Sequence, residues 1–110
     1  MPRIAFRNST GILFCLVLAL PNIVWAEGDT AQLYKANCAV CHAADGSGNS
    51  PSGKALKSKD LRADEAQKKS DAELADFITK GQGKMPPFGK KLNPEQIQQL
   101  MSYVRQLGKK

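Results

Sequence analysis

The sequence predicts an all-α domain, and two observations carry that prediction. Three segments place apolar residues at the spacing of an amphipathic helix, each beside a recognisable start or stop residue. No segment alternates apolar and polar residues as a half-buried strand does, and no internal repeat is present. A chain of 110 residues has room for one such domain.

The N-terminal segment is expected to be removed before the domain folds. Two arginines precede an apolar run over residues 11–20, and small residues ending at Ala26 provide a cleavage site. This pattern predicts a secretory signal peptide over residues 1–26 and a mature domain over residues 27–110. The alternative is an uncleaved membrane anchor, but the run is shorter than the roughly 20 apolar residues that span a bilayer.

The composition of the mature chain limits what it can bind and how it folds. Cleavage after Ala26 leaves 84 residues with 14 Lys and Arg against 10 Asp and Glu, a net charge of +4. The basic residues form no compact run with interleaved aromatics, so nucleic acid is not an expected partner. Cys15 leaves with the signal, and only Cys38 and Cys41 remain. So short a chain rarely builds a sufficient core alone, and we expect it to be largely unfolded without a bound cofactor.

The first half of the mature chain contains one clear helix. It is expected over residues 29–41, beginning at an Asp-Thr cap and offering Leu33 and Tyr34 for packing. Residues 45–53 are dense in Gly, Ser, Asn and Pro, which predicts a loop. A short helix is expected over residues 63–68.

The second half contains two helices joined by a stiff loop. Ser70-Asp-Ala-Glu73 is a capping box followed by an apolar stripe, and Gly81 is expected to end that helix. Two consecutive prolines restrict the loop over residues 82–89. The last helix is expected over residues 93–107, with Asn as N-cap, Pro at N1 and Gln at N3.

The first helix leads into a C-x-x-C-H motif, Cys38-Ala-Val-Cys41-His42, which is the attachment pattern for a c-type haem. Two thiols three residues apart on a helix fall on one face. There they can form thioether bonds to the two vinyl groups on one porphyrin edge. His42 follows directly and can bind the iron.

Three other interpretations of the motif are weaker. A thioredoxin-type redox pair belongs to a βαβ context, and no strand–helix alternation surrounds this motif. A structural zinc site needs four protein ligands, and outside residues 38–42 the chain offers only Cys15 and no histidine. A chance motif would leave two free thiols on a secreted protein, which is unfavourable.

The second axial ligand cannot be a second histidine of the same chain, because the sequence contains only one. Met101 lies on the apolar stripe of the last helix and is expected to be a packing residue. Met85 lies in the Pro-Pro loop between glycines, from which a thioether can reach iron on the face opposite His42. The alternatives are Met85 packing on the haem edge, a neutral lysine as ligand, and an open sixth site.

Two segments carry a resemblance to a known family: Lys84-Met-Pro-Pro-Phe-Gly-Lys-Lys-Leu-Asn-Pro-Glu-Gln-Ile97 and Tyr103-Val-Arg-Gln-Leu107. With the C-x-x-C-H helix, they resemble the class I c-type cytochromes, especially the small bacterial carriers of the cytochrome c6 and c551 type. The resemblance covers essentially all of the mature chain. It implies the class I cytochrome c fold, with three to four short helices wrapped around one covalently bound haem c.

The resemblance also implies roles for individual residues. The haem-binding cysteine pair, the proximal ligand and the distal ligand of the family fall on Cys38, Cys41, His42 and Met85. The family places a proline carbonyl against the proximal histidine N–H, and Pro51 is similarly placed here.

Two further expectations concern packing. The apolar side chains expected to line the haem pocket are Leu56, Leu61 and Phe88. The family packs its first and last helices crosswise, which would bring Leu33 or Tyr34 against Tyr103 or Val104.

The implied function is electron transfer and not enzymatic catalysis, because His/Met ligation leaves substrate no open position on iron. We expect a monomeric carrier that shuttles electrons between redox complexes in the periplasm, without a membrane span after cleavage; the thylakoid lumen is the alternative compartment. Exposed lysines would steer it to redox proteins with acidic docking surfaces. Two other functions remain open: a dedicated haem c subunit of a periplasmic dehydrogenase or reductase, and an enzyme or gas sensor with a labile Met85.

Overall fold

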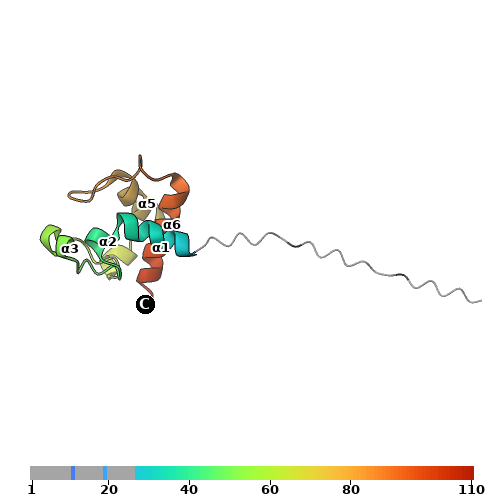
Figure 1. Cartoon of the computed structure of the whole chain (residues 1–110), viewed down its shortest axis with the longest axis horizontal. Coiled ribbons are helices and arrows are strands. Elements are labelled where there is room, and N and C mark those ends of the chain that lie inside the picture. The colour runs from blue at the N-terminus through green and yellow to red at the C-terminus, as the bar shows by residue number, and fades with distance from the viewer. Residues whose placement is uncertain (1–10, 12–18, 20–26) are drawn as a thin grey trace, which may run out of the picture.

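The computed structural model describes residues 27–110, together with Gly11 and Ala19. Within residues 27–110 it contains six helices and no strand (Figure 1): α1 (Glu27–Asn37), α2 (Ala39–His42), α3 (Pro51–Leu56), α4 (Asp64–Gln67), α5 (Asp71–Lys80) and α6 (Pro94–Leu107). The all-α class is therefore confirmed. The predicted signal peptide and Cys15 lie outside the described residues, apart from those two isolated positions.

The helix count exceeds the three to four expected, because three of the six helices have only four to six residues. The predicted helix over residues 29–41 begins earlier, at Glu27, and is interrupted at Cys38, after which α2 completes the motif. The predicted loop over residues 45–53 is helical from Pro51 onward. Its helix forms because the Ser50 hydroxyl accepts a hydrogen bond from the Gly53 N–H (2.9 Å) and proline occupies N1.

The two longer helices of the second half begin as the sequence predicts. Both have a complete capping box. In α5 the Ser70 hydroxyl accepts from the Glu73 N–H at 3.1 Å, and in α6 the Asn93 side chain accepts from the Gln96 N–H at 2.8 Å. Each cap contributes about 1 kcal/mol to helix stability. Gly81 follows the last residue of α5, as expected.

The core forms where α6 packs against α1 and α5, with α1 crossing α6 (Figure 1). Its most buried side chains are Tyr34 of α1 and Leu100 of α6. The rings of Tyr34 and Tyr103 lie 4.8 Å apart between centroids, tilted by 35°. This contact confirms the crosswise packing of the first and last helices. Met101 is buried in the same core, as its position on the apolar stripe predicts.

Of the short helices, α3 packs on α2, which forms the second part of the cysteine–histidine motif. In the part of the chain that the structure describes, no helix is long and apolar enough to cross a membrane.

Candidate functional site

The cysteine–histidine motif forms one compact turn at the end of α1. The Cys38 N–H donates to the Tyr34 carbonyl at 2.8 Å, and the His42 N–H donates to the Cys38 carbonyl at 2.9 Å. The hydrogen bonds of α1 therefore end at Cys38, and those of α2 begin there. Both cysteines are half-buried free thiols, so the two sulfur atoms and the imidazole come from five consecutive residues without a disulfide between them.

The environment of the thiols argues against the competing interpretations of the motif. Burial raises the pKa of the Cys38 thiol to about 11, and the neighbouring Cys41 adds to the shift. A thioredoxin-type cysteine has a lowered pKa, because its thiolate is the reacting species. Across the described residues, no group of three or more His, Cys, Asp or Glu side chains is arranged to hold a metal ion. Neither redox-thiol nor zinc chemistry fits this turn.

A hydrogen bond identifies which ring nitrogen of His42 carries a proton. Its Nδ1 atom lies 3.0 Å from the backbone carbonyl oxygen of Lys59. A carbonyl oxygen can only accept, so Nδ1 carries the hydrogen, and in the neutral ring Nε2 is the nitrogen with a free lone pair. A hydrogen bond of this kind fixes the ring and increases its strength as a metal ligand.

The carbonyl that meets His42 is not the one that the resemblance implied. It belongs to Lys59, 17 residues after the histidine, and not to Pro51. Pro51 is exposed and occupies the first position of α3, so its carbonyl points along that helix toward the following turn. The segment leading to Leu61, and not the start of α3, therefore supports the imidazole.

Helix α3 instead supports the backbone of the motif. The Ser50 hydroxyl lies 2.8 Å from the Val40 carbonyl and 3.2 Å from the Cys41 carbonyl, so its proton is shared between two carbonyls at the end of α2. The first turn of α3 needs glycine at position 53, because a Cβ atom at Gly53 would collide with the Cys41 carbonyl oxygen. Leu56, at the end of α3, is 40% exposed in this structure.

The loop that carries Met85 is tied to the end of α5 at both of its ends. It pairs with itself through Gln82 and Met85, whose backbones exchange hydrogen bonds of 3.1 and 2.9 Å. It then returns to α5, where the Phe88 N–H donates to the Ile78 carbonyl at 3.0 Å. At Gly81 the backbone has φ +72°, and a Cβ there would lie 2.5 Å from the Met85 carbonyl oxygen. Met85 therefore sits on a short, closed loop.

Four of the predicted site residues pack against the same hydrophobic core, although they come from separate parts of the chain: Cys38, Leu61, Met85 and Phe88. Pro51 and Leu56 do not join them, because both lie on exposed positions of α3.

Sequence reasoning missed three residues that support the site: Ser50, Gly53 and Lys59. The Lys59 carbonyl accepts from His42, and the Ser50 hydroxyl donates to the carbonyls at the end of α2. Gly53 has no side chain and therefore lets the Cys41 carbonyl come close to its backbone. A carbonyl has no side-chain pattern, so Lys59 left no signal in the sequence. Ser50 could have been found, because Ser-Pro is the start pattern of a helix.

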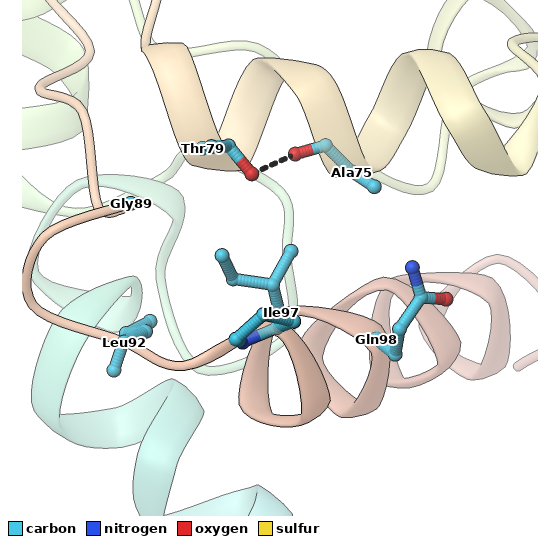
Figure 2. A pocket seen from close by; sticks show the side chains of 7 residues that line it. Ala75, Thr79, Gly89, Leu92, Ile97 and Gln98 are labelled. Carbon is cyan, nitrogen blue, oxygen red and sulfur yellow. Dashed lines mark hydrogen bonds between the residues drawn. The ribbon is translucent and has the colours of Figure 1, made fainter.

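A cavity of about 180 Å³ lies elsewhere, between α5 and the start of α6 (Figure 2). Ile97 and Leu92 line it, and its one side-chain hydroxyl, that of Thr79, donates to the Ala75 carbonyl at 2.7 Å. None of the predicted site residues borders this cavity, and it is too small for a porphyrin.

The donor set of the motif and the methionine loop fits a c-type haem. It provides two free thiols, an imidazole with a free Nε2 lone pair and a half-buried thioether, and all of these are neutral ligands or covalent anchors.

The comparisons with known proteins agree with this chemistry. Residues 26–104 match the family model described as cytochrome C oxidase, cbb3-type, subunit III. A cytochrome c6 from Gloeothece citriformis is 33% identical over 100 residues, covering 90% of this chain and 87% of the relative. A cytochrome c6 from a Nostoc species is 35% identical over 97 residues, covering 88% and 83%.

Two further matches extend the comparison. The cbb3-type cytochrome c oxidase subunit FixP from Azorhizobium caulinodans is 36% identical over 90 residues, which cover 76% of this chain but 30% of FixP. Among solved structures, the KustC0563 c-type cytochrome superposes with a TM-score of 0.63 at 33% identity, covering 71% of this chain and 95% of the other.

The chain belongs to the family of small class I c-type cytochromes that this family model and these relatives represent. It is therefore a haem c protein, with the haem covalently bound, and its function is electron transport.

Proposed function

We propose that this protein is an exported one-electron carrier whose haem c is attached through Cys38 and Cys41 and ligated by His42 and Met85. The observation that carries the proposal is the hydrogen bond made by the His42 ring. Its Nδ1–H donates to the Lys59 carbonyl, which leaves Nε2 as the free nitrogen. An imidazole so oriented is prepared for a permanent metal bond.

The residues around the site would keep the two redox states alike. Bound haem c supplies the one-electron iron couple. An imidazole and a thioether would fill both axial positions, and the thioether favours the reduced state. The His42 ring is held by a carbonyl, and the Met85 loop is tied to α5. With both ligands fixed, electron transfer would require little rearrangement of the chain.

Replacing Met85 with alanine tests the ligand assignment, and replacing Met101 is the matched control. The ferric wild-type protein is expected to show the weak far-red band of sulfur-ligated haem. Met85→Ala should lose that band, bind CO readily in the ferrous state and have a lower reduction potential. Met101→Ala should keep all three wild-type properties while losing about 2 to 5 kcal/mol of stability, because Met101 is buried in the core.

The opposite pattern, with the band lost only in Met101→Ala, would show that the ligand was assigned to the wrong methionine. A wild-type protein that lacks the band and binds CO freely would contradict the closed carrier site. That result would favour a sensor or an enzyme with an open position on iron.

A second candidate function is that of a dedicated haem subunit in a larger redox complex. It is favoured by the family model, which describes an oxidase subunit, and by the similarity to FixP. Size-exclusion chromatography of the native protein separates the two functions. A free carrier elutes near the size of the 84-residue chain, whereas a subunit co-elutes with a stable partner.

The surface charge supports docking to acidic redox proteins. Most of the lysines are exposed, among them Lys54, Lys57, Lys84 and Lys90. We expect the rate of electron transfer to an acidic partner to fall as salt is added, and a rate that does not depend on salt would contradict this docking mode.

Export to the periplasm rests on the predicted signal peptide. The intact mass of the purified holoprotein tests it, because cleavage would leave Glu27 as the first residue. An uncleaved chain would contradict export by this route.

A further inference from the structure

The side-chain amide of Gln67 joins two distant parts of the chain. Its Nε2 atom lies 2.6 Å from the Leu61 carbonyl oxygen and 3.1 Å from the Val104 carbonyl oxygen. An amide nitrogen has two protons, so each carbonyl receives one. Gln67 thereby connects α6 to the segment that ends at Leu61, and no other residue type of that length presents two neutral donors in this way.

The segment that Gln67 reaches is the one that supports His42. Its backbone is anchored on both sides of Lys59: the Ser58 N–H donates to the Gly53 carbonyl at 2.8 Å, and the Leu61 N–H donates to the Gly46 carbonyl at 2.7 Å. Gln67 satisfies the remaining polar group of Leu61, its carbonyl. The Lys59 carbonyl is therefore held in place from two residues away by the Gln67 amide.

Gln67 is itself held in position. Its own carbonyl accepts from Arg105 Nη1 at 2.7 Å, and the same guanidinium binds the Lys69 carbonyl and the Asp71 carboxylate. Gly108 lies against the Gln67 amide so closely that a Cβ there would collide with it. Gln67 is thus fixed at its backbone carbonyl and at its side-chain amide. A residue that positions another group must itself be fixed in this way.

We propose that Gln67 is a positioning residue for the proximal histidine: through Leu61 it holds the Lys59 carbonyl against His42 Nδ1–H, and so it sets the reduction potential. The inference rests on His42 as an axial ligand, as proposed above. A firm Nδ1–H···O bond makes the imidazole a stronger donor and favours the oxidised state. Loosening that bond weakens the donor and raises the potential.

Gln67→Met tests the proposal, because it keeps the length of the side chain and removes both donors. Met101→Ala is the matched control, since it weakens the packing of α6 without removing a hydrogen bond of Gln67, Arg105 or Leu61. Three quantities are measured in each holoprotein: the free energy of unfolding, the reduction potential, and the exchange rate of the His42 ring N–H in the reduced state. Both variants should lose stability. Only Gln67→Met should shift the potential to a more positive value and accelerate ring N–H exchange, by about tenfold.

Gln67→Leu is a second variant, in case Gln67→Met yields too little holoprotein. It also removes both donors and adds no charge, so it should move the potential and the exchange rate in the same direction.

Two results would overturn the proposal: a Gln67 variant that leaves the potential and the exchange rate unchanged, or a Met101→Ala protein that changes both equally. Either would show that Gln67 contributes only to stability, by holding α4 to α6. Failure of the ligand assignment would be seen separately, in the wild-type spectrum before any substitution.

Discussion

At the scale of single residues, the backbone after His42 is strained. Ala43 has φ 63° and ψ 163°, a region that is essentially restricted to glycine and costs about 1 to 3 kcal/mol for other residues. The Tyr34 hydroxyl helps to hold this conformation by donating to the Ala43 carbonyl at 2.7 Å. Burial raises the pKa of Tyr34, so the hydroxyl stays a donor over the working pH range.

Replacing Ala43 with glycine should therefore stabilise the protein. The strain is relieved, and the greater freedom of glycine in the unfolded chain offsets part of the gain, which leaves about 1 kcal/mol. Thermal unfolding of the holoprotein measures the effect as a rise in Tm of about 5 °C. A lower Tm would show that Ala43 does not adopt this conformation.

Gly81 is the residue on which the position of Met85 depends most directly. Its φ of +72° and its close approach to the Met85 carbonyl both exclude a side chain. Gly81→Ala should cost more than about 2 kcal/mol and weaken or abolish the far-red band of sulfur-ligated haem.

Gly83→Ala is the control for this variant, because Gly83 also has a positive φ but its Cβ would meet nothing within 4 Å. It should cost about 1 kcal/mol and keep the band. Equal effects of the two substitutions on the band would remove the argument that Gly81 positions the methionine.

At the scale of elements, the two capping boxes differ in one chemical respect. The side chain that reaches back to the N-cap is Glu73 in α5 and Gln96 in α6. Hydrogen bonds from Ser70, first from its backbone N–H and then from its hydroxyl group, lower the pKa of Glu73 below its ordinary value of 4.5. The cap of α5 is therefore sensitive to acid, whereas the cap of α6 is not.

The sign of the pH effect follows from the lowered pKa. Glu73 contributes stability above pH 4.5, and this contribution is lost as the pH falls through the lower value of the folded state. Glu73→Gln keeps the cap without a titrating group. Urea unfolding of both proteins over a pH series should show the advantage of the wild type shrinking as the solution is acidified. A difference that does not change with pH would contradict the role of the carboxylate.

The elements also show what the sequence can predict. Both long helices of the second half start at their predicted caps, because a capping box is a local signal that tertiary contacts do not override. The break at Cys38 and the helix at Pro51 were missed. At Cys38 no capping side chain marks the break, and at Pro51 the turn residues before it obscured the Ser-Pro start pattern. The support of His42 by Lys59 depends on a backbone carbonyl, which no residue pattern reveals.

At the scale of the whole molecule, the site draws on both halves of the chain. The motif with its imidazole follows α1, and the methionine loop follows α5, while α6 packs against both of these helices. Gln67 and Arg105 add polar contacts between α6 and the segments that precede α5. The positions of the two proposed ligands thus depend on contacts made by the last helix.

The methyl resonances of methionine test the central claim, that Met85 completes a closed His/Met site, most directly. In the reduced holoprotein labelled with ¹³C-methyl methionine, the porphyrin ring current should shift the Met85 methyl signal far upfield, while the Met101 methyl keeps an ordinary position. Substituting each methionine in turn assigns the signals. A Met85 methyl at an ordinary position, or an upfield signal that belongs to Met101, would contradict the ligation proposed for this protein.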